Sequence, residues 1–199
     1  MRATPDSPRM FDADWLDALS RTPWWTVPLL WVPISAGLFA TALTRGAQPL
    51  GAAAATFAAG YLVWTLTEYA LHRTVFHWVP RASWGPRFHF ILHGVHHDWV
   101  FDRLRLVMPP SVSVLLGLVF GAAFRLVLGP QHWWAAFSGF TAGYLVYDVT
   151  HYAVHHLKLR GPVFAALKRH HLLHHHSPAH RGRKFGVSTT LWDHIFRTH

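Results

Sequence analysis

The stretch HWWAAFSGFTAGYLVYDVTHYAV, residues 132–154, decides the architecture of this chain. It contains one acidic residue and no Lys or Arg, and it opens with a Trp pair of the kind found where a bilayer meets water. About 20 apolar residues suffice to cross a hydrocarbon core of roughly 30 Å. The stretch nevertheless contains His151 near its end, and His155 and His156 follow immediately. Titratable rings therefore gather where an apolar segment stops.

Three further segments have the same apolar character, and they cover residues 24–43, 50–72 and 110–129. Short polar turns at 45–49 and 130–131 join the four segments into two hairpins. The predicted fold is an all-α integral membrane protein with four transmembrane helices in two hairpins and a cytoplasmic His-rich helical cap that holds a dinuclear metal site. The predicted domains are residues 1–23, a tail with an interfacial amphipathic helix, and residues 24–199, the membrane domain with its cap. In the N-terminal tail, residues 10–21 have the spacing of an amphipathic helix. Its apolar face is formed by residues four apart, Phe11, Trp15 and Leu19, and the acidic residues Asp12, Asp14 and Asp17 lie off that face.

The basic residues indicate the orientation in the membrane. With four spans, both termini and the 73–109 loop share one side, and that side carries 16 of the 18 Lys and Arg residues. Cytoplasmic segments are enriched in Lys and Arg, so both termini and the metal site are expected in the cytoplasm, and the membrane is predicted to be a bacterial inner membrane. The net charge of +9 lies between apolar segments, so no nucleic-acid partner is expected. The absence of cysteine excludes disulfides, thiolate metal sites and a cysteine nucleophile.

Ten of the 18 histidines fall in four clusters. Two clusters lie at the ends of the hairpins, and each is followed by a further cluster. They are His72 and His77; His93, His96 and His97; His151 and His155; and His171, His174 and His175. Residues three and four apart share a helix face, so the rings within each of the last three clusters can converge. His72 and His77 are five apart, about 140° around an ideal helix. Either the helix ends near 73–76, or these two rings serve different metals.

Ten imidazoles are too many for one ion, and two ions with about five ligands each is the economical interpretation. His156 and His170 are expected to surround the ligands, as are Glu68 and Asp148, which lie one turn before His72 and His151. Carboxylates placed there either orient a ligating imidazole or pair with a basic residue such as Arg73. His176 and His180 are expected to be supporting or surface groups, and His89, His132, His194 and His199 packing or surface groups.

Four stretches carry a resemblance to a known family: EYALHRTVFH (68–77), LHGVHHDWVFDRLRLVMPP (92–110), YDVTHYAVHH (147–156) and HHLLHHHSPAHRGRKFGVSTTLWDHIF (170–196). They resemble the fatty acid hydroxylase superfamily, the histidine-box membrane enzymes that include sterol desaturases, and are most similar to fatty acid 2-hydroxylases. The resemblance covers most of residues 60–199. It implies that the ten clustered histidines bind two metal ions, expected to be iron, with zinc possible in purified samples. The dinuclear centre itself would be catalytic: it would activate O2 and hydroxylate an acyl chain.

The resemblance also implies partners and departures. The substrate would be a membrane lipid or fatty acyl chain, and the electrons would come from a separate reductase or carrier. Arg81, Arg87, Arg103 and Arg105 could dock an acidic partner or a lipid head group, or simply mark a cytoplasmic loop. Eukaryotic relatives often have a fused cytochrome domain ahead of the spans, for which this chain is expected to have no room. The family tends to place an acid before the final histidine pair, where this chain has Leu173.

Two other classes of function remain open at this point. One is a desaturase or hydroxylase of another lipid, such as a sterol or a carotenoid. The other is a non-enzymatic protein, either a metal transporter or a scaffold that metal ions stabilise. A transporter would be expected to place its ligands near the middle of the spans, whereas these histidines gather at one side.

Overall fold

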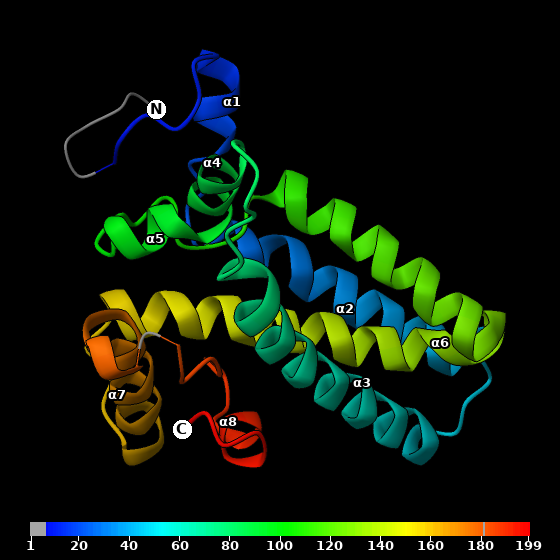
Figure 1. Cartoon of the computed structure of the whole chain (residues 1–199). Helices are drawn as coiled ribbons and strands as arrows, with labels where there is room; N and C mark the ends of the chain where they lie inside the picture. The colour runs from blue at the N-terminus through cyan, green and yellow to red at the C-terminus, as the bar shows by residue number, and fades with distance from the viewer. Residues whose placement is uncertain (1–6, 181) are drawn as a thin grey trace.

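The computed structural model describes residues 7–180 and 182–199, and the regular elements of this part of the chain are helical (Figure 1). The α-helices are α1 (Asp14–Leu19), α2 (Thr26–Thr44), α3 (Leu50–Leu71), α4 (Gly85–His89), α5 (Val95–Asp98), α6 (Pro110–His156), α7 (Pro162–His176) and α8 (Leu191–Ile195). Two π-helical turns, η1 (His72–Phe76) and η2 (Phe90–Gly94), and one 3-10 turn, η3 (Pro178–His180), complete the set.

Three helices in the described residues are long and apolar enough to cross a membrane: Thr26–Thr44, Leu50–Phe76 and Pro110–His156. The third has 47 residues. At a rise of 1.5 Å per residue a straight helix of that length would measure about 70 Å, more than twice a hydrocarbon core. It is not straight, because Gly129 has non-helical dihedral angles (φ 76°, ψ 169°) and Pro130 follows it. The two arms fold back on each other there (Figure 1), with the rings of Phe124 and Phe137 5.5 Å apart.

The bundle is closed by small residues on α3 and on the second arm of α6. A Cβ added at Gly60 would lie 1.8 Å from the carbonyl oxygen of Ala136, and one at Gly139 would lie 1.9 Å from that of Phe57. Only glycine allows the two backbones to approach this closely. This is the close helix packing that the Ala and Gly content of the second span predicts.

Helix α1, the 73–109 loop and the C-terminal tail lie at one end of the bundle, and the turn near Gly46 and the kink at Gly129 lie at the other (Figure 1). The amphipathic helix expected over 10–21 is shorter, since α1 covers Asp14–Leu19. Asp17, which the spacing places off the apolar face, is nevertheless buried, because its side chain is 5% exposed between two guanidiniums. Arg21 lies 3.0 Å and Arg105 2.9 Å from its carboxylate. This buried network fastens the N-terminal segment to the 73–109 loop.

Candidate metal centre

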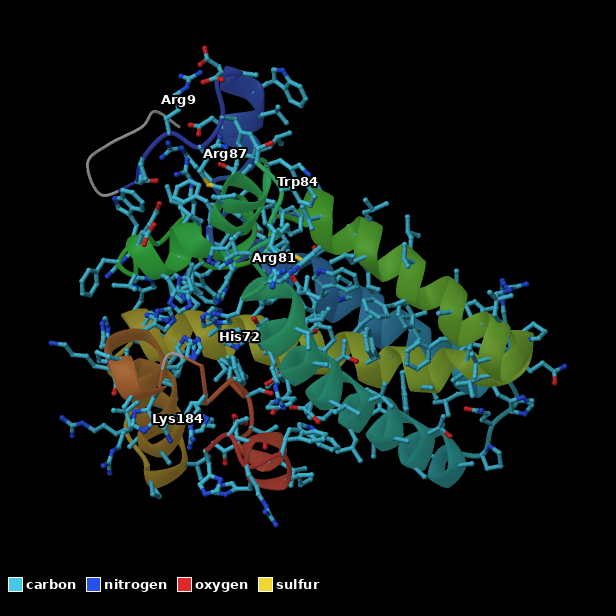
Figure 2. All side chains as sticks on the ribbon, viewed as in Figure 1. Arg9, His72, Arg81, Trp84, Arg87 and Lys184 are labelled. Carbon is cyan, nitrogen blue, oxygen red and sulfur yellow. The ribbon has the colours of Figure 1, made fainter. Side chains whose placement is uncertain are left out.

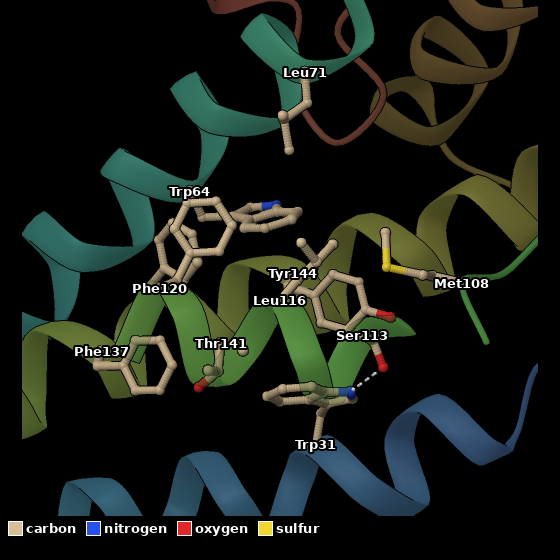
Figure 3. Close-up of a pocket in the computed structure, with 12 residues that line it drawn as sticks. Trp31, Trp64, Leu71, Met108, Ser113, Leu116, Phe120, Phe137, Thr141 and Tyr144 are labelled. Atoms are coloured by element: carbon tan, nitrogen blue, oxygen red, sulfur yellow. Dashed lines mark hydrogen bonds between the residues drawn. The ribbon is translucent and has the colours of Figure 1, made fainter. Parts of the chain in front are cut away.

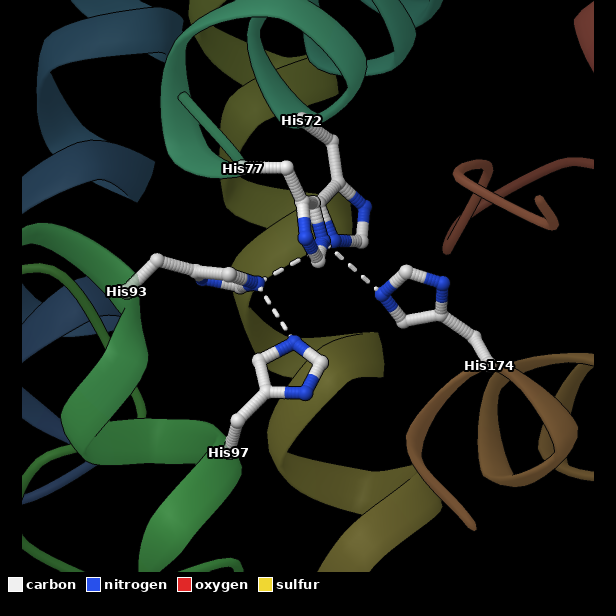
Figure 4. Close-up of side chains that lie close together, drawn as sticks. All are labelled: His72, His77, His93, His97 and His174. Carbon is white, nitrogen blue, oxygen red and sulfur yellow. Dashed lines mark hydrogen bonds between the residues drawn. The ribbon is translucent and has the colours of Figure 1, made fainter. Parts of the chain in front are cut away.

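The ten clustered histidines meet at the end of the bundle that carries the 73–109 loop and the C-terminal tail, and they form two groups of five. The first group contains His72, His77, His93, His97 and His174, and the second contains His96, His151, His155, His171 and His175. Within each group the candidate ligand atoms all lie within 4.8 Å of one another. Figure 4 shows the first group, whose five rings come from three separate parts of the chain and turn their nitrogens toward one point. The structure thus brings together every histidine that the spacing singled out.

A π-helical turn explains how His72 and His77 join one group. The α-helix α3 ends at Leu71, and η1 continues over His72–Phe76 with the wider hydrogen-bonding pattern of a π-helix. Residues five apart can share a face in that geometry, and the two rings lie 5.0 Å apart. The regular helix thus ends at Leu71, shortly before the region 73–76 where it was expected to stop, and the π-helical turn that follows brings both rings into one group.

Two of the sequence clusters are divided between the groups, so that each gives two rings to one group and one ring to the other. The spacing alone did not indicate this division. His93 and His97 enter the first group, whereas His96 from the same cluster enters the second. Conversely, His171 and His175 enter the second group and His174 enters the first. Each group therefore takes two rings from the end of a hairpin, an i,i+4 pair from the cluster that follows, and one ring from the other half of the chain. This division ties the two halves together at their polar end.

The nitrogen-to-nitrogen distances fit a shared cation. The Nε2 atom of His93 lies 3.2 Å from that of His72 and 3.0 Å from that of His97. In the second group the Nε2 atom of His171 lies 2.8 Å from that of His155 and 3.0 Å from that of His175. Two imidazole nitrogens bound at about 2.1 Å and at right angles to each other are roughly 3.0 Å apart. These spacings are thus those of neighbouring ligands around one ion.

The protonation state of the rings also suits metal binding. Burial, followed by the nearby His174, lowers the pKa of His77 to about 4 and that of His97 to about 3. Burial likewise holds the pKa of His96 well below its ordinary value. The Nε2 atoms of His96 and His151 are buried without a hydrogen-bond partner. A buried polar atom left unpaired is costly, and a bound cation would satisfy both nitrogens.

The C-terminal tail orients two rings of the first group through backbone carbonyls. The Nδ1 atom of His72 lies 2.6 Å from the carbonyl oxygen of Phe185, and that of His174 lies 2.6 Å from the carbonyl oxygen of Arg183. With Nδ1–H donating to these carbonyls, each ring presents the lone pair of Nε2 to the centre. Sequence reasoning missed these two positions, because a backbone carbonyl has no residue signature.

Asp193 holds this tail in place and was also missed. Its fully buried carboxylate accepts hydrogen bonds from the backbone N–H groups of Phe185 (2.9 Å) and Gly186 (2.8 Å) and from the hydroxyl of Thr198 (2.7 Å). His170 lies 3.0 Å from the same carboxylate. Burial alone would raise the pKa of Asp193, but His170 and the other donors together lower it below its ordinary value. Its place in the WDHIF stretch could have signalled an acid in an apolar setting.

The two carboxylates expected to support the ligands contact other groups. Glu68 accepts hydrogen bonds from the backbone N–H of Val187 (3.2 Å) and of Ser188 (3.0 Å), from the Ser188 hydroxyl (2.6 Å) and from the Trp64 indole (3.2 Å). It therefore anchors the tail next to Phe185. Neither a direct bond to an imidazole nor a pair with Arg73 is among its contacts.

Asp148 lies on the other hairpin and serves a different segment. It accepts hydrogen bonds from the backbone N–H of Met108 (3.1 Å) and from the hydroxyl of Tyr144 (2.9 Å). It thereby fixes the chain just before α6. His156 and His170 lie outside both groups: His170 binds Asp193, and His156 packs on Tyr152 with ring centroids 4.7 Å apart.

A cavity of about 470 Å³ leads from the surface to both groups of histidines. His93 from the first group and His96 and His151 from the second line its inner end. The rest of its wall is largely apolar and is formed by α1, by residues 91–95 and by the first turns of α6. Its volume lies in the range of pockets that bind small molecules. A long apolar ligand could therefore place one end next to both groups.

Two of the four arginines suggested for docking have other partners. Arg87 donates to the carbonyl of Met10, and Arg105 binds Asp17 and the carbonyl of Pro8. Arg87 and Arg105 therefore hold the N-terminal segment; of the four, Arg105 is buried, whereas Arg81, Arg87 and Arg103 are exposed. Figure 2 shows Arg87 beside the N-terminal segment and His72 nearer the middle of the molecule. His132 lies exposed at the far turn, as expected of a surface group.

The apolar helices and the ten histidines at one end of the bundle place this chain in the class of integral membrane proteins with a histidine-rich centre. The model of the family described as fatty acid hydroxylase matches residues 57–198, and the chain belongs to this family. The chain is 37% identical over 98% of its length to a dihydroceramide fatty acyl 2-hydroxylase of Arabidopsis thaliana, of which it covers 81%. It is 35% identical over 96% of its length to human fatty acid 2-hydroxylase, of which it covers 56%.

One solved structure has the same fold. It is described as full-length scs7p with only the hydroxylase domain visible, and it superposes with a TM-score of 0.87 at 38% identity. The match covers 97% of this chain and 72% of the other. A relative from Saccharomyces cerevisiae is named a ceramide very long chain fatty acid hydroxylase. It is 40% identical over 94% of this chain, and this chain covers 48% of that relative's length.

Proposed function

We propose that this protein is a membrane-bound, O2-dependent hydroxylase that places a hydroxyl group on C2 of a fatty acyl chain. The observation that carries the proposal is the apolar cavity whose inner end is lined by histidines from both groups. Relatives named fatty acyl or fatty acid 2-hydroxylase support the reaction and the acyl substrate. A carbon next to a polar head group suits a centre located where the bundle meets its polar cap.

The ten histidines would hold two iron ions, five imidazoles to each. Bound there, the ions would supply the activation of O2 that attack on an unactivated C–H bond requires. The chain itself keeps the imidazoles neutral, orients His72 and His174 through the carbonyls of Phe185 and Arg183, and excludes water from the inner end of the cavity. Zinc would bind the same donors, so a purified sample can contain it.

Four membrane crossings are proposed, with α2, α3 and each arm of α6 crossing once. The fold of α6 at Gly129 supports this count, since each arm is of spanning length. We propose that both termini and the centre face the cytoplasm. With four spans, 16 of the 18 Lys and Arg residues lie on the side of the membrane that carries them, and cytoplasmic segments are enriched in these residues. Residues 1–23 would form a tail with an interfacial helix, and residues 24–199 the hydroxylase domain. The bacterial inner membrane stays a prediction.

The electrons would come from a separate carrier or reductase. His77, His97, His155 and His175 are only partly buried and form the side of the centre nearest to solvent. An acidic carrier could approach there, with exposed Arg81 and Arg103 on the same cap.

The test is to express the chain in cells that lack 2-hydroxylated lipids and to supply ¹⁸O2. Mass spectrometry should find acyl chains that gain one labelled oxygen atom at C2, and metal analysis of the purified protein should find about two ions per chain. His96→Ala should remove the product and lower the metal content. His132→Ala, at the exposed far turn, is the matched control and should change neither. A folded, metal-loaded protein that oxidises no lipid would instead favour the scaffold, and a product on a sterol or carotenoid would favour the other lipid classes.

A further inference from the structure

A second, smaller cavity of about 30 Å³ lies deeper among the spans, between α2, α3 and the two arms of α6 (Figure 3). Its lining is largely aromatic and aliphatic: Trp31, Trp64, Leu71, Met108, Ser113, Leu116, Gly117, Phe120, Phe137, Phe140, Thr141 and Tyr144. The volume equals about two water-sized spheres. A void of this size with apolar walls suits one or two methylene groups better than water.

Two side chains, Met108 and Leu116, line both cavities. On the first arm of α6 the large cavity is lined by Val112 and the small one by Gly117 and Phe120. The second arm repeats this order, with Tyr147 and Asp148 lining the large cavity and Phe140 and Tyr144 the small one. The small cavity therefore continues the large one by about one helical turn, in the direction away from the histidines.

One side of the small cavity is closed by fixed groups. The indole of Trp31 donates to the hydroxyl of Ser113 (3.3 Å) and packs edge-on against Tyr144, with ring centroids 5.3 Å apart. A Cβ added at Gly117 would lie 2.6 Å from the Trp31 ring, so the ring fills the space beside that glycine. Phe120, Phe137 and Phe140 close the end that lies away from the histidines. A chain entering from the large cavity would stop here.

The boundary between the cavities differs from this closed end, because it consists of two flexible side chains. Met108 has three rotatable bonds beyond its backbone, and Leu116 is only partly buried. The backbone of Met108 is nevertheless held in place, since its N–H donates to Asp148 (3.1 Å). The side chain can move while its attachment point stays fixed beside His151.

We propose that the small cavity receives the methyl end of the acyl chain, and that Met108 and Leu116 form a partition that sets the preferred chain length. This inference rests on the proposed function, because it names which part of the substrate occupies which part of the cavity. Each additional buried methylene group strengthens binding roughly fourfold. Removing part of the partition should therefore favour chains about two carbons longer by roughly tenfold or more over the wild-type preference.

The experiment compares Leu116→Ala and Leu116→Phe with the wild type on a series of saturated acyl substrates of graded length. The ratio of long-chain to short-chain hydroxylation should rise about tenfold in the first variant and fall in the second. Leu115→Ala is the matched control, because Leu115 is 62% exposed on the outer face of the same helix, and its profile should equal that of the wild type. An unchanged length profile in both Leu116 variants would overturn the proposal.

A second measurement separates this inference from the hydroxylase activity. The protein in lipid nanodiscs is heated with fatty acids of graded length, and the rise in its unfolding temperature is recorded for each. The length giving the largest rise should shift upward in Leu116→Ala, and in Met108→Ala if the first variant does not fold. Length-dependent protection without any hydroxylated product would leave the partition standing and sink the proposed reaction. Protection that does not depend on length would sink the partition, whatever the activity.

Discussion

The two groups of five histidines are built alike but are supported differently. Each combines a hairpin end, an i,i+4 pair and one ring from the other half of the chain. In the first group, His72 and His174 are oriented by carbonyls of the C-terminal tail. In the second, the Nδ1 atoms of His171 and His175 are buried without a partner in the described part of the chain.

The hairpin ends that carry the two groups also differ in their helical geometry. His151 and His155 stand four apart on the regular end of α6, whereas His72 and His77 need the π-helical turn η1. A regular helix end positions its rings by itself, but an irregular one needs outside contacts. The first group therefore depends on the tail, and the second on the stiffness of α6.

The largest effect is expected from variants that test how the histidines of one cluster are divided between the two groups. His174→Ala should lower the metal content from about two ions to about one per chain, because it removes a ligand of the first group although it lies on α7. Adding His93→Ala should cause little further loss, and adding His171→Ala should remove the second ion as well, since residues of one site are not additive. His176→Ala, exposed on the same helix, is the control. This division is refuted if His174 and His171 prove to belong to one site.

A smaller effect is expected from releasing the tail. Asp193→Ala removes the acceptor that holds Phe185 and Gly186, so the Phe185 carbonyl should no longer orient His72. Affinity for the metal of the first group should fall by about 10-fold or more, with the other site unchanged. Chelator competition on the purified protein measures both affinities, and Asp98→Asn on the exposed end of α5 serves as the control. Equal weakening of both sites would break the proposed difference between them.

Substitution of Asp17 is expected to have the smallest effect on the metal centre. Its effect on the stability of the fold should nevertheless be clear. Asp17→Asn leaves Arg21 and Arg105 without their buried carboxylate and should lower the free energy of unfolding by about 3 kcal/mol. Metal content should stay near two ions per chain. Asp14→Asn is the control, because its side chain is 91% exposed in a surface pair with Arg9. Thermal unfolding followed by metal analysis checks both parts.

The same residue gives a pH dependence. Burial raises the pKa of Asp17, but the N–H of Met10, the Arg21 side chain and the N–H of Phe11 together lower it below its ordinary value. A group with a depressed folded-state pKa stabilises the protein above its unfolded value and loses that contribution as the pH falls through the folded value. The wild type should therefore lose stability below about pH 4 by this route. Asp17→Asn should lack that part of the decline, and an identical decline in both proteins would refute it.

Much of the centre could be predicted from residue spacing. Apolar length marked the spans, and clusters at i,i+3,i+4 marked eight of the ten rings, because both depend on neighbours within one helix. The shorter α1, the burial of Asp17 and the contacts of Glu68 could not be predicted in this way. Each depends on groups far away along the chain: Arg105 lies 88 residues from Asp17, and Ser188 lies 120 residues from Glu68.

Three properties follow from the amino-acid sequence alone: the chain is helical, it is apolar enough to enter a membrane, and its ten clustered histidines gather at one end. Local periodicity and transfer free energy fix these properties without reference to the rest of the fold. Only the tertiary structure decided which rings share a group, that η1 brings His72 and His77 together, and that Asp193 and the Phe185 carbonyl support the first group. Those outcomes depend on directions in space, which hydrogen bonds and packing between distant segments set and which spacing along one helix does not record.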